Sequence, residues 1–127
     1  MNGGRYLLDS HILIWLDSGN DRIKPPLLET LRWADQRYLS AATGWELGLK
    51  QAAGKLRLRA PIGAMLDSFQ LTEMPVTIRH GDRAAQLPLL HRDPFDRMLV
   101  AQALVEGLIL ITGDKRLAEY GVPILLV

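Results

Sequence analysis

Short apolar segments that suit β-strands alternate with helix-like segments along the whole chain. Short, almost wholly apolar strands are typical of a parallel sheet covered on both faces, whereas strands with one solvent-exposed face alternate apolar and polar residues. We expect strands at residues 6–8, 38–39, 74–76, 108–112 and 124–127. Because helical segments are expected in every interval, the pattern predicts an α/β fold around a mainly parallel sheet.

The helical segments have recognisable starts and ends, marked by prolines, capping residues and glycines. We expect helices near residues 12–16, 25–34, 41–53, 62–71, 78–87 and 94–105, and a short helical turn at 115–120. Ser40 is the expected N-cap of the third helix. In that helix we expect one apolar stripe, formed by Ala42, Trp45, Leu49 and Ala53, with Glu46 at its edge.

The segment from Arg92 to Leu99 contains a plain helix start. Asp93 suits the N-cap, Pro94 the first helical position, and Asp96 the third position after the cap. The apolar run that follows predicts a buried helix. Both carboxylates fit the helix dipole, and for Asp93 we adopt this structural interpretation. For Asp96 it is insufficient, because other acidic residues are expected at the same place.

The composition is that of a folded globular domain and excludes several classes of site. A chain of 127 residues, 48% hydrophobic and 23% charged, suits one compact domain spanning residues 1–127. The net charge of +1 excludes a global polyanion-binding signal, so contacts with nucleic acid must come from a local patch. The absence of cysteine excludes thiolate metal sites and suits the cytoplasm. Residues 1–5 lack signal-peptide architecture, and no apolar run is long enough to span a membrane.

Acidic residues lie where a parallel sheet gathers functional groups, beyond the carboxyl ends of its strands. Asp9 directly follows the first strand, and Asp114 lies just after the fourth. Asp96 begins the helix before that fourth strand, so it starts near the same edge. Glu46 is a fourth candidate. Each residue alone also fits an ordinary role, as a turn or cap for the aspartates and as a surface residue for Glu46.

Carboxylates brought together in this way repel one another, and a divalent cation removes the conflict. Oxygen ligands without cysteine select a hard ion, Mg²⁺ or Mn²⁺. Such an ion can generate hydroxide from a bound water and stabilise the leaving oxygen of a phosphodiester. The pattern therefore favours metal-dependent phosphodiester hydrolysis.

Two other features have both a structural and a functional interpretation. His11 lies near Asp9 and suits either contact with a substrate or a packed or capping role. The segment Lys55–Arg59 alternates charge with leucine. It suits either an exposed strand or loop with a solvated basic face, or an edge that contacts phosphates.

Four segments together resemble PIN-domain proteins, and most closely the VapC-type toxins of toxin–antitoxin pairs. They are LLDSH at 7–11, SAATGWE at 40–46, HRDPFDRMLVAQA at 91–103 and TGD at 112–114. The third segment is highly specific, and the resemblance covers nearly the whole chain. Ser10 and Thr43 stand where threonine and serine, respectively, are more usual, and both keep a hydroxyl group.

The resemblance implies a three-layer α/β/α sandwich and cleavage of RNA by an acidic quartet that binds Mg²⁺ or Mn²⁺. Asp9 and Asp96 are the expected principal metal ligands, and Glu46 and Asp114 are expected to complete the acidic pocket. Either Ser10 or Thr112 is expected to position a phosphate through its hydroxyl group. These six residues, Asp9, Ser10, Glu46, Asp96, Thr112 and Asp114, are the candidate site.

The resemblance also implies partners. It implies an RNA substrate, a homodimer, and a small antitoxin of the VapB type that occupies the active-site groove. Two other functions stay open at the level of sequence: a catalytically silent PIN-like module that binds RNA or protein, and a PIN nuclease of RNA processing. Acidic residues at all four positions argue against the silent module.

Overall fold

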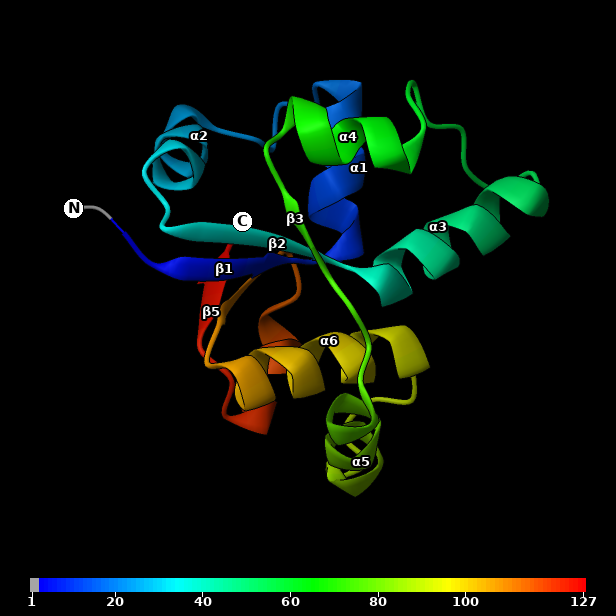
Figure 1. The fold of residues 1–127 in the computed structure, drawn as a ribbon, viewed down its shortest axis with the longest axis vertical. Coiled ribbons are helices and arrows are strands. Elements are labelled where there is room, and N and C mark those ends of the chain that lie inside the picture. The colour runs from blue at the N-terminus through cyan, green and yellow to red at the C-terminus, as the bar shows by residue number, and fades with distance from the viewer. Residues whose placement is uncertain (1–2) are drawn as a thin grey trace.

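A sheet of five parallel strands forms the centre of the molecule (Figure 1). The computed structural model describes residues 3–127, so Met1 and Asn2, part of the segment considered as a signal peptide, lie outside the described residues. The strands are β1 (Arg5–Leu8), β2 (Gln36–Ser40), β3 (Thr72–Met74), β4 (Ile109–Thr112) and β5 (Ile124–Leu126). Their order is β3-β2-β1-β4-β5, and every pairing is parallel, which confirms the expected sheet.

Helices cover both faces of the sheet. They are α1 (Ser10–Ser18), α2 (Pro25–Arg32), α3 (Ala41–Ala52), α4 (Ile62–Ser68), α5 (Ile78–Gln86), α6 (Pro94–Glu106) and the 3₁₀-helix η1 (Lys115–Tyr120). Figure 1 shows α1, α2 and α4 on one side of the sheet and α5 and α6 on the other, which confirms the α/β/α sandwich. Within residues 3–127 no helix is both long and apolar enough to cross a bilayer.

Neighbouring residues of the central strands serve opposite layers, because successive side chains in a strand point to opposite faces. Leu7 and Leu110 belong to the apolar cluster formed with α6 and η1. Leu8 and Ile111 belong to the cluster formed with α1, α2, α3 and α4. All four side chains are fully buried. The central strands are apolar along their length because the sheet is buried on both faces at its centre.

Two of the expected segments differ in the structure. The third strand covers Thr72–Met74 instead of residues 74–76, because Pro75 lacks the N–H group that would continue the ladder. The basic segment Lys55–Arg59 contains no strand and forms a loop. Leu56 and Leu58 pack against the core, while the three basic side chains of this loop are exposed, as the solvated-face interpretation expects.

Helix α3 turns a different face to the core than the one expected. Trp45 and Leu49 are 66% and 49% exposed, so the predicted apolar stripe is wrong. The buried residues of α3 are Ala42, Thr43, Glu46 and Leu47. Ser40 does cap the helix, with its hydroxyl accepting a hydrogen bond from the Ala42 N–H. The polar residues of α3 face the core because the Ser10 hydroxyl of α1 hydrogen-bonds to Thr43 and Glu46.

The strand order brings distant parts of the chain together at one edge. The chain adds strands outward from β1 to β3 and then returns to the other side of β1 with β4, which makes β1 and β4 neighbours. In open parallel sheets this reversal is where ligands bind, beyond the carboxyl ends of the strands. Asp9 follows β1 and Asp114 lies just after β4, so both stand at this edge.

Candidate active site

An acidic pocket of about 250 Å³ opens at the carboxyl edge of β1 and β4, beside α3 and the start of α6. Its lining residues are Asp9, His11, Trp15, Arg22, Glu46, Lys50, Asp93, Asp96, Gly113 and Asp114. The structure therefore brings all four predicted carboxylates into one pocket and adds a fifth, that of Asp93. We refer to this set of ten residues as the acidic pocket.

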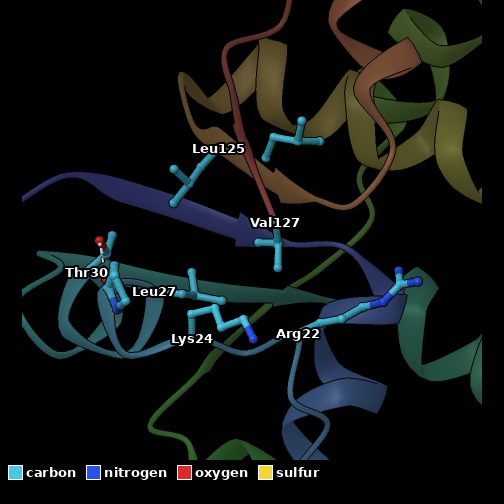
Figure 2. A pocket seen from close by; sticks show the side chains of 8 residues that line it. Arg22, Lys24, Leu27, Thr30, Leu125 and Val127 are labelled. Atoms are coloured by element: carbon cyan, nitrogen blue, oxygen red, sulfur yellow. Dashed lines mark hydrogen bonds between the residues drawn. The ribbon is translucent and has the colours of Figure 1, made fainter.

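A second pocket, of about 270 Å³, lies between α2 and β5 and has a different chemistry (Figure 2). Its lining residues are Arg22, Lys24, Pro26, Leu27, Thr30, Leu125, Leu126 and Val127, none of which carries a carboxylate side chain. Hydrolysis of a phosphodiester by a metal ion needs oxygen ligands of the kind that the acidic pocket offers. The chemistry therefore points to the acidic pocket.

Asp9 is the most enclosed of the aspartates in the acidic pocket. It stands at the N-cap position of α1, but its side chain makes no capping hydrogen bond. Instead, Oδ2 accepts a hydrogen bond of 2.7 Å from the Thr112 hydroxyl at the end of β4. Burial raises the pKa of Asp9, and the hydrogen bond from Thr112 opposes this shift.

Asp96 carries the clearest sign of charge crowding. Burial raises the pKa of Asp96 to about 7, and the negative charges of other pocket carboxylates add to the effect, Asp93 first. The further contributors are Asp9, Glu46 and Asp114. Burial and the repulsion between carboxylates act in the same direction, and both favour the protonated form of Asp96.

Asp93 has the structural role that the sequence indicated. Its Oδ1 accepts hydrogen bonds from the N–H groups of Phe95 at 2.8 Å and Asp96 at 3.3 Å, which caps α6. Pro94 occupies the first turn, as expected. The cap is therefore confirmed, and because Asp93 also lines the acidic pocket, its charge acts on Asp96.

Glu46 is buried in the structure, so the alternative of a surface glutamate is wrong. Only 6% of the residue is exposed. Its Oε1 accepts a hydrogen bond of 2.6 Å from the Ser10 hydroxyl, and its Oε2 lies 2.8 Å from Lys50 Nζ, one helical turn further along α3. A buried carboxylate with both oxygens engaged is fixed in orientation.

Asp114 combines a cap with an ion pair. Oδ1 accepts a hydrogen bond of 3.0 Å from the Arg116 N–H, which starts η1. The Arg116 guanidinium also donates to both oxygens of Asp114, at 3.0 and 2.8 Å. This contact holds the pKa of Asp114 below its usual value, so the carboxyl is ionised at neutral pH.

The two hydroxyl groups proposed for phosphate contact face the carboxylates instead. Ser10 and Thr112 are 2% and 0% exposed, and each hydroxyl donates to a buried carboxylate, that of Glu46 and Asp9 respectively. The geometry thus supports a role in positioning the acidic side chains. The expectation that either hydroxyl contacts a phosphate has no support from this arrangement.

The carboxylates of the acidic pocket suit a divalent ion that keeps some of its water ligands better than an ion coordinated by protein side chains alone. Among the residues that the structure describes, no three His, Asp or Glu side chains form a group ready to hold a metal ion. The acidic pocket nevertheless offers five carboxylates as oxygen ligands, and burial together with the neighbouring negative charges raises the pKa of Asp96. Mg²⁺ keeps several waters and needs only one or two direct carboxylates, which suits a pocket of this size.

Several residues of the acidic pocket were not singled out from the sequence. They are Trp15, Arg22, Lys50 and Gly113. Lys50 follows Glu46 by four residues, a helical spacing that favours an ion pair and offered a usable signal. Trp15 and Arg22 meet through the conformation of a loop, for which the sequence gives no periodic signal. His11 lines the pocket and is exposed, with its ring centroid 6.0 Å from that of Trp15, so a histidine packed in the core is excluded. Its contact with a substrate stays a prediction.

Comparisons with known proteins extend over most of the chain. Residues 6–123 match the family model of the PIN domain. Ribonuclease VapC22 from Mycobacterium tuberculosis is 29% identical over 120 residues, which cover 92% of each chain.

Two solved structures show the same fold. A chain in the crystal structure of VapBC2 from Rickettsia felis bound to a DNA fragment from their promoter matches with a TM-score of 0.72 and 15% identity, over 95% of this chain and 97% of that one. A chain of a toxin–antitoxin complex from Klebsiella pneumoniae matches with a TM-score of 0.65 and 23% identity, over 94% and 95%. Since the family model matches residues 6–123, which is most of the chain, the chain belongs to the PIN-domain family.

Proposed function

We propose that this PIN-domain protein is a divalent-metal-dependent endoribonuclease and the toxin of a toxin–antitoxin pair. The observation that carries the proposal is the meeting of Asp9, Glu46, Asp96 and Asp114 in one pocket from separate elements of the fold. Two comparisons support it. The relative from M. tuberculosis is named a ribonuclease, and a chain of similar fold occurs in a toxin–antitoxin complex.

Mg²⁺ or Mn²⁺ is the proposed cofactor because the pocket offers carboxylate oxygens. Asp9 and Asp96 would be the principal ligands, and Glu46 and Asp114 would bind directly or through water. When bound, the ion would supply an activated water and stabilise the leaving oxygen of the RNA phosphodiester.

The residues around the carboxylates prepare them for this role. Thr112 fixes one oxygen of Asp9, and Asp9 lines the acidic pocket. Lys50 and Arg116 keep Glu46 and Asp114 paired and oriented. Asp96 would release a proton when a cation binds, because burial raises its pKa to about 7 in the absence of a metal. Three carboxylates held by neighbouring side chains and one that changes charge therefore frame the site.

The direct test is cleavage of end-labelled single-stranded RNA by the purified protein. After dialysis against EDTA we expect no cleavage, and addition of Mg²⁺ or Mn²⁺ should restore it. Asp96→Asn should reduce cleavage by on the order of 100-fold or more, because it removes a charged ligand. Asp82→Asn, an exposed position on α5, is the matched control and should cleave normally.

Two outcomes would refute the proposal. Undiminished cleavage by demonstrably metal-free protein would exclude the metal mechanism. Binding of RNA without cleavage under every metal tested would instead indicate a silent binding module.

The proposed protein partner is a small VapB-like antitoxin, and the proposed location is the cytoplasm. We expect the antitoxin to insert a basic side chain beside Asp9 and Asp96, because a guanidinium pairs well with clustered carboxylates. A complex in which the inhibitor leaves the acidic pocket open would count against this mode of inhibition. The homodimer implied by the resemblance stays a prediction.

A further inference from the structure

The acidic pocket poses an electrostatic problem for the proposed substrate. Its lining contains five carboxylates, those of Asp9, Glu46, Asp93, Asp96 and Asp114, whereas RNA brings one negative charge with every phosphate. A hydrated divalent ion offsets part of this repulsion at the reacting phosphate. Cationic side chains at the mouth are needed to hold the neighbouring phosphates.

Two cations in or beside the pocket are already engaged. Lys50 Nζ lies 2.8 Å from Glu46, and the Arg116 guanidinium is paired with Asp114. Arg22 differs from both, because within residues 3–127 its guanidinium has neither a hydrogen bond nor an ion pair. Arg22 is therefore the cation of the pocket lining whose donors are free for a ligand.

Stacking, and not ion pairing, places the Arg22 guanidinium. Its Cζ lies 4.8 Å from the centroid of the Trp15 ring, within the range of a cation–π contact. In Figure 2 the Arg22 side chain extends away from Leu27 and Thr30. Its guanidinium therefore points away from the second pocket, the one between α2 and β5, although Arg22 also lines that pocket. A stacked guanidinium keeps its N–H groups directed outward in the plane of the fork.

The Trp15 ring is itself held in place by the backbone that follows β4. A Cβ atom added to Gly113 would lie 2.8 Å from Trp15 Cη2, so the indole packs directly on the glycine beside Asp114. The loop before Arg22 is also fixed, since the Arg22 N–H donates to Asn20 Oδ1 at 2.9 Å and the Asn20 N–H donates to the Trp15 carbonyl at 3.0 Å. Gly113, Trp15 and Arg22 thus form a rigid stack at the rim.

We propose that Arg22 binds a backbone phosphate of the single-stranded RNA substrate next to the scissile bond, with Trp15 as the platform that orients its guanidinium. The planar fork matches two phosphate oxygens, and the stacked placement lowers the entropy lost when the contact forms. This inference rests on the proposed function. It adds a substrate-binding residue outside the acidic quartet, contributed by the loop between α1 and α2.

The test is RNA affinity as a function of salt. A fluorescently labelled single-stranded RNA is titrated with the protein in Ca²⁺ in place of Mg²⁺, with electrophoresis to verify that the RNA stays intact. For single strands, each phosphate contact contributes about 0.7 to the slope of log affinity against log salt. We expect Arg22→Gln to lower the slope by about 0.7 and to weaken binding on the order of tenfold at low salt.

Two further variants separate a specific contact from a general charge effect. Arg32→Gln removes the same charge from a guanidinium that lies 5.3 Å from the Trp33 ring, away from the acidic pocket, and should leave the slope unchanged. Arg22→Lys keeps the charge and should keep the slope, with affinity between those of the wild type and Arg22→Gln. Thermal melting should be the same for all of these proteins, because both arginines are exposed.

The outcomes distinguish this inference from the proposed function. If the wild type binds and cleaves RNA while Arg22→Gln keeps the wild-type slope and affinity, the phosphate contact is refuted and the nuclease stands. An equal loss in Arg32→Gln would refute it as well, because the effect would then be one of net charge. If the wild type neither binds nor cleaves RNA, the proposed function fails and this inference fails with it.

Discussion

The Thr112 hydroxyl donates a hydrogen bond of 2.7 Å to Asp9 Oδ2 across 103 residues of sequence. The same hydroxyl accepts a hydrogen bond of 3.0 Å from the Asp114 N–H. One buried hydroxyl therefore links Asp9, after β1, to Asp114, after β4, and both of these aspartates line the acidic pocket. This pair of hydrogen bonds fixes two proposed site residues, Asp9 and Asp114, to the ends of neighbouring strands.

Replacement of this hydroxyl should damage both stability and activity. In Thr112→Val one oxygen of buried Asp9 loses its donor, which costs about 1–3 kcal/mol in the free energy of unfolding at neutral pH. The pKa of Asp9 should rise further, because the opposing hydrogen bond is gone. Cleavage should fall by roughly 10–100-fold, as expected when a partner that orients a metal ligand is removed.

Thr112→Ser serves as the control because it keeps the hydroxyl. It should melt and cleave close to the wild type, whereas Thr112→Val should differ in both measurements. If the valine and serine variants behave alike, Thr112 acts only through packing.

The raised pKa of Asp96 predicts a pH dependence of the metal-free protein. Between the ordinary value of 3.8 and the folded value of about 7, the folded state binds more protons at this site than the unfolded state. Stability from this group therefore falls as pH rises through that window and changes little outside it. Thermal melting in EDTA at pH 5 and pH 8 should show a larger decrease for the wild type than for Asp96→Asn. Equal decreases would place the titrating group elsewhere.

Metal affinity should have the opposite pH dependence. A cation that binds Asp96 displaces its proton, so affinity should increase by about tenfold per pH unit below pH 7 and level off above it. Calorimetric titration with Mn²⁺ at pH 6 and pH 8, in two buffers of different ionisation enthalpy, measures both the affinity and the proton release. No proton release at pH 6 would mean that Asp96 is not a ligand.

The sequence indicated the features that depend on local signals. The Asp93–Pro94 start of α6 and the cap at Ser40 were predictable, because capping depends on residues within one turn. The carboxyl edge shared by Asp9 and Asp114 followed from the alternation of strands and helices, since parallel strands end at the same side of a sheet.

Features that depend on distant partners could not be predicted. In α3 the stripe through Trp45 and Leu49 is more apolar than the buried face, which contains Thr43 and Glu46, so periodicity alone favours the wrong face. The choice is made by Ser10, which lies 36 residues before Glu46 and donates to it. The stack of Arg22 on Trp15 likewise depends on the loop between α1 and α2 and on Gly113, which lies far from both residues in the sequence.

The first turn of α6 allows structure and chemistry to be separated with two neighbouring aspartates. Asn caps a helix about as well as Asp, whereas Ala loses about 1 kcal/mol in the free energy of unfolding. Asp93→Asn should therefore keep most stability and cleavage, and Asp93→Ala should melt earlier. Asp96→Asn removes a proposed metal ligand and one member of a repelling cluster. Its cleavage should fall by orders of magnitude, while the metal-free protein at pH 8 should melt at the same temperature as the wild type or higher.

The measurement is RNA cleavage and thermal melting of all three variants, with EDTA and with Mg²⁺. Mg²⁺ should raise the melting temperature of the wild type and of Asp93→Asn but not that of Asp96→Asn, because a ligand stabilises only the state that binds it. Normal cleavage by Asp96→Asn would refute the assignment of the site. If Asp93→Asn folds normally and is as inactive as Asp96→Asn, the Asp93 carboxylate belongs to the metal site in addition to capping α6, since both side chains line the same pocket.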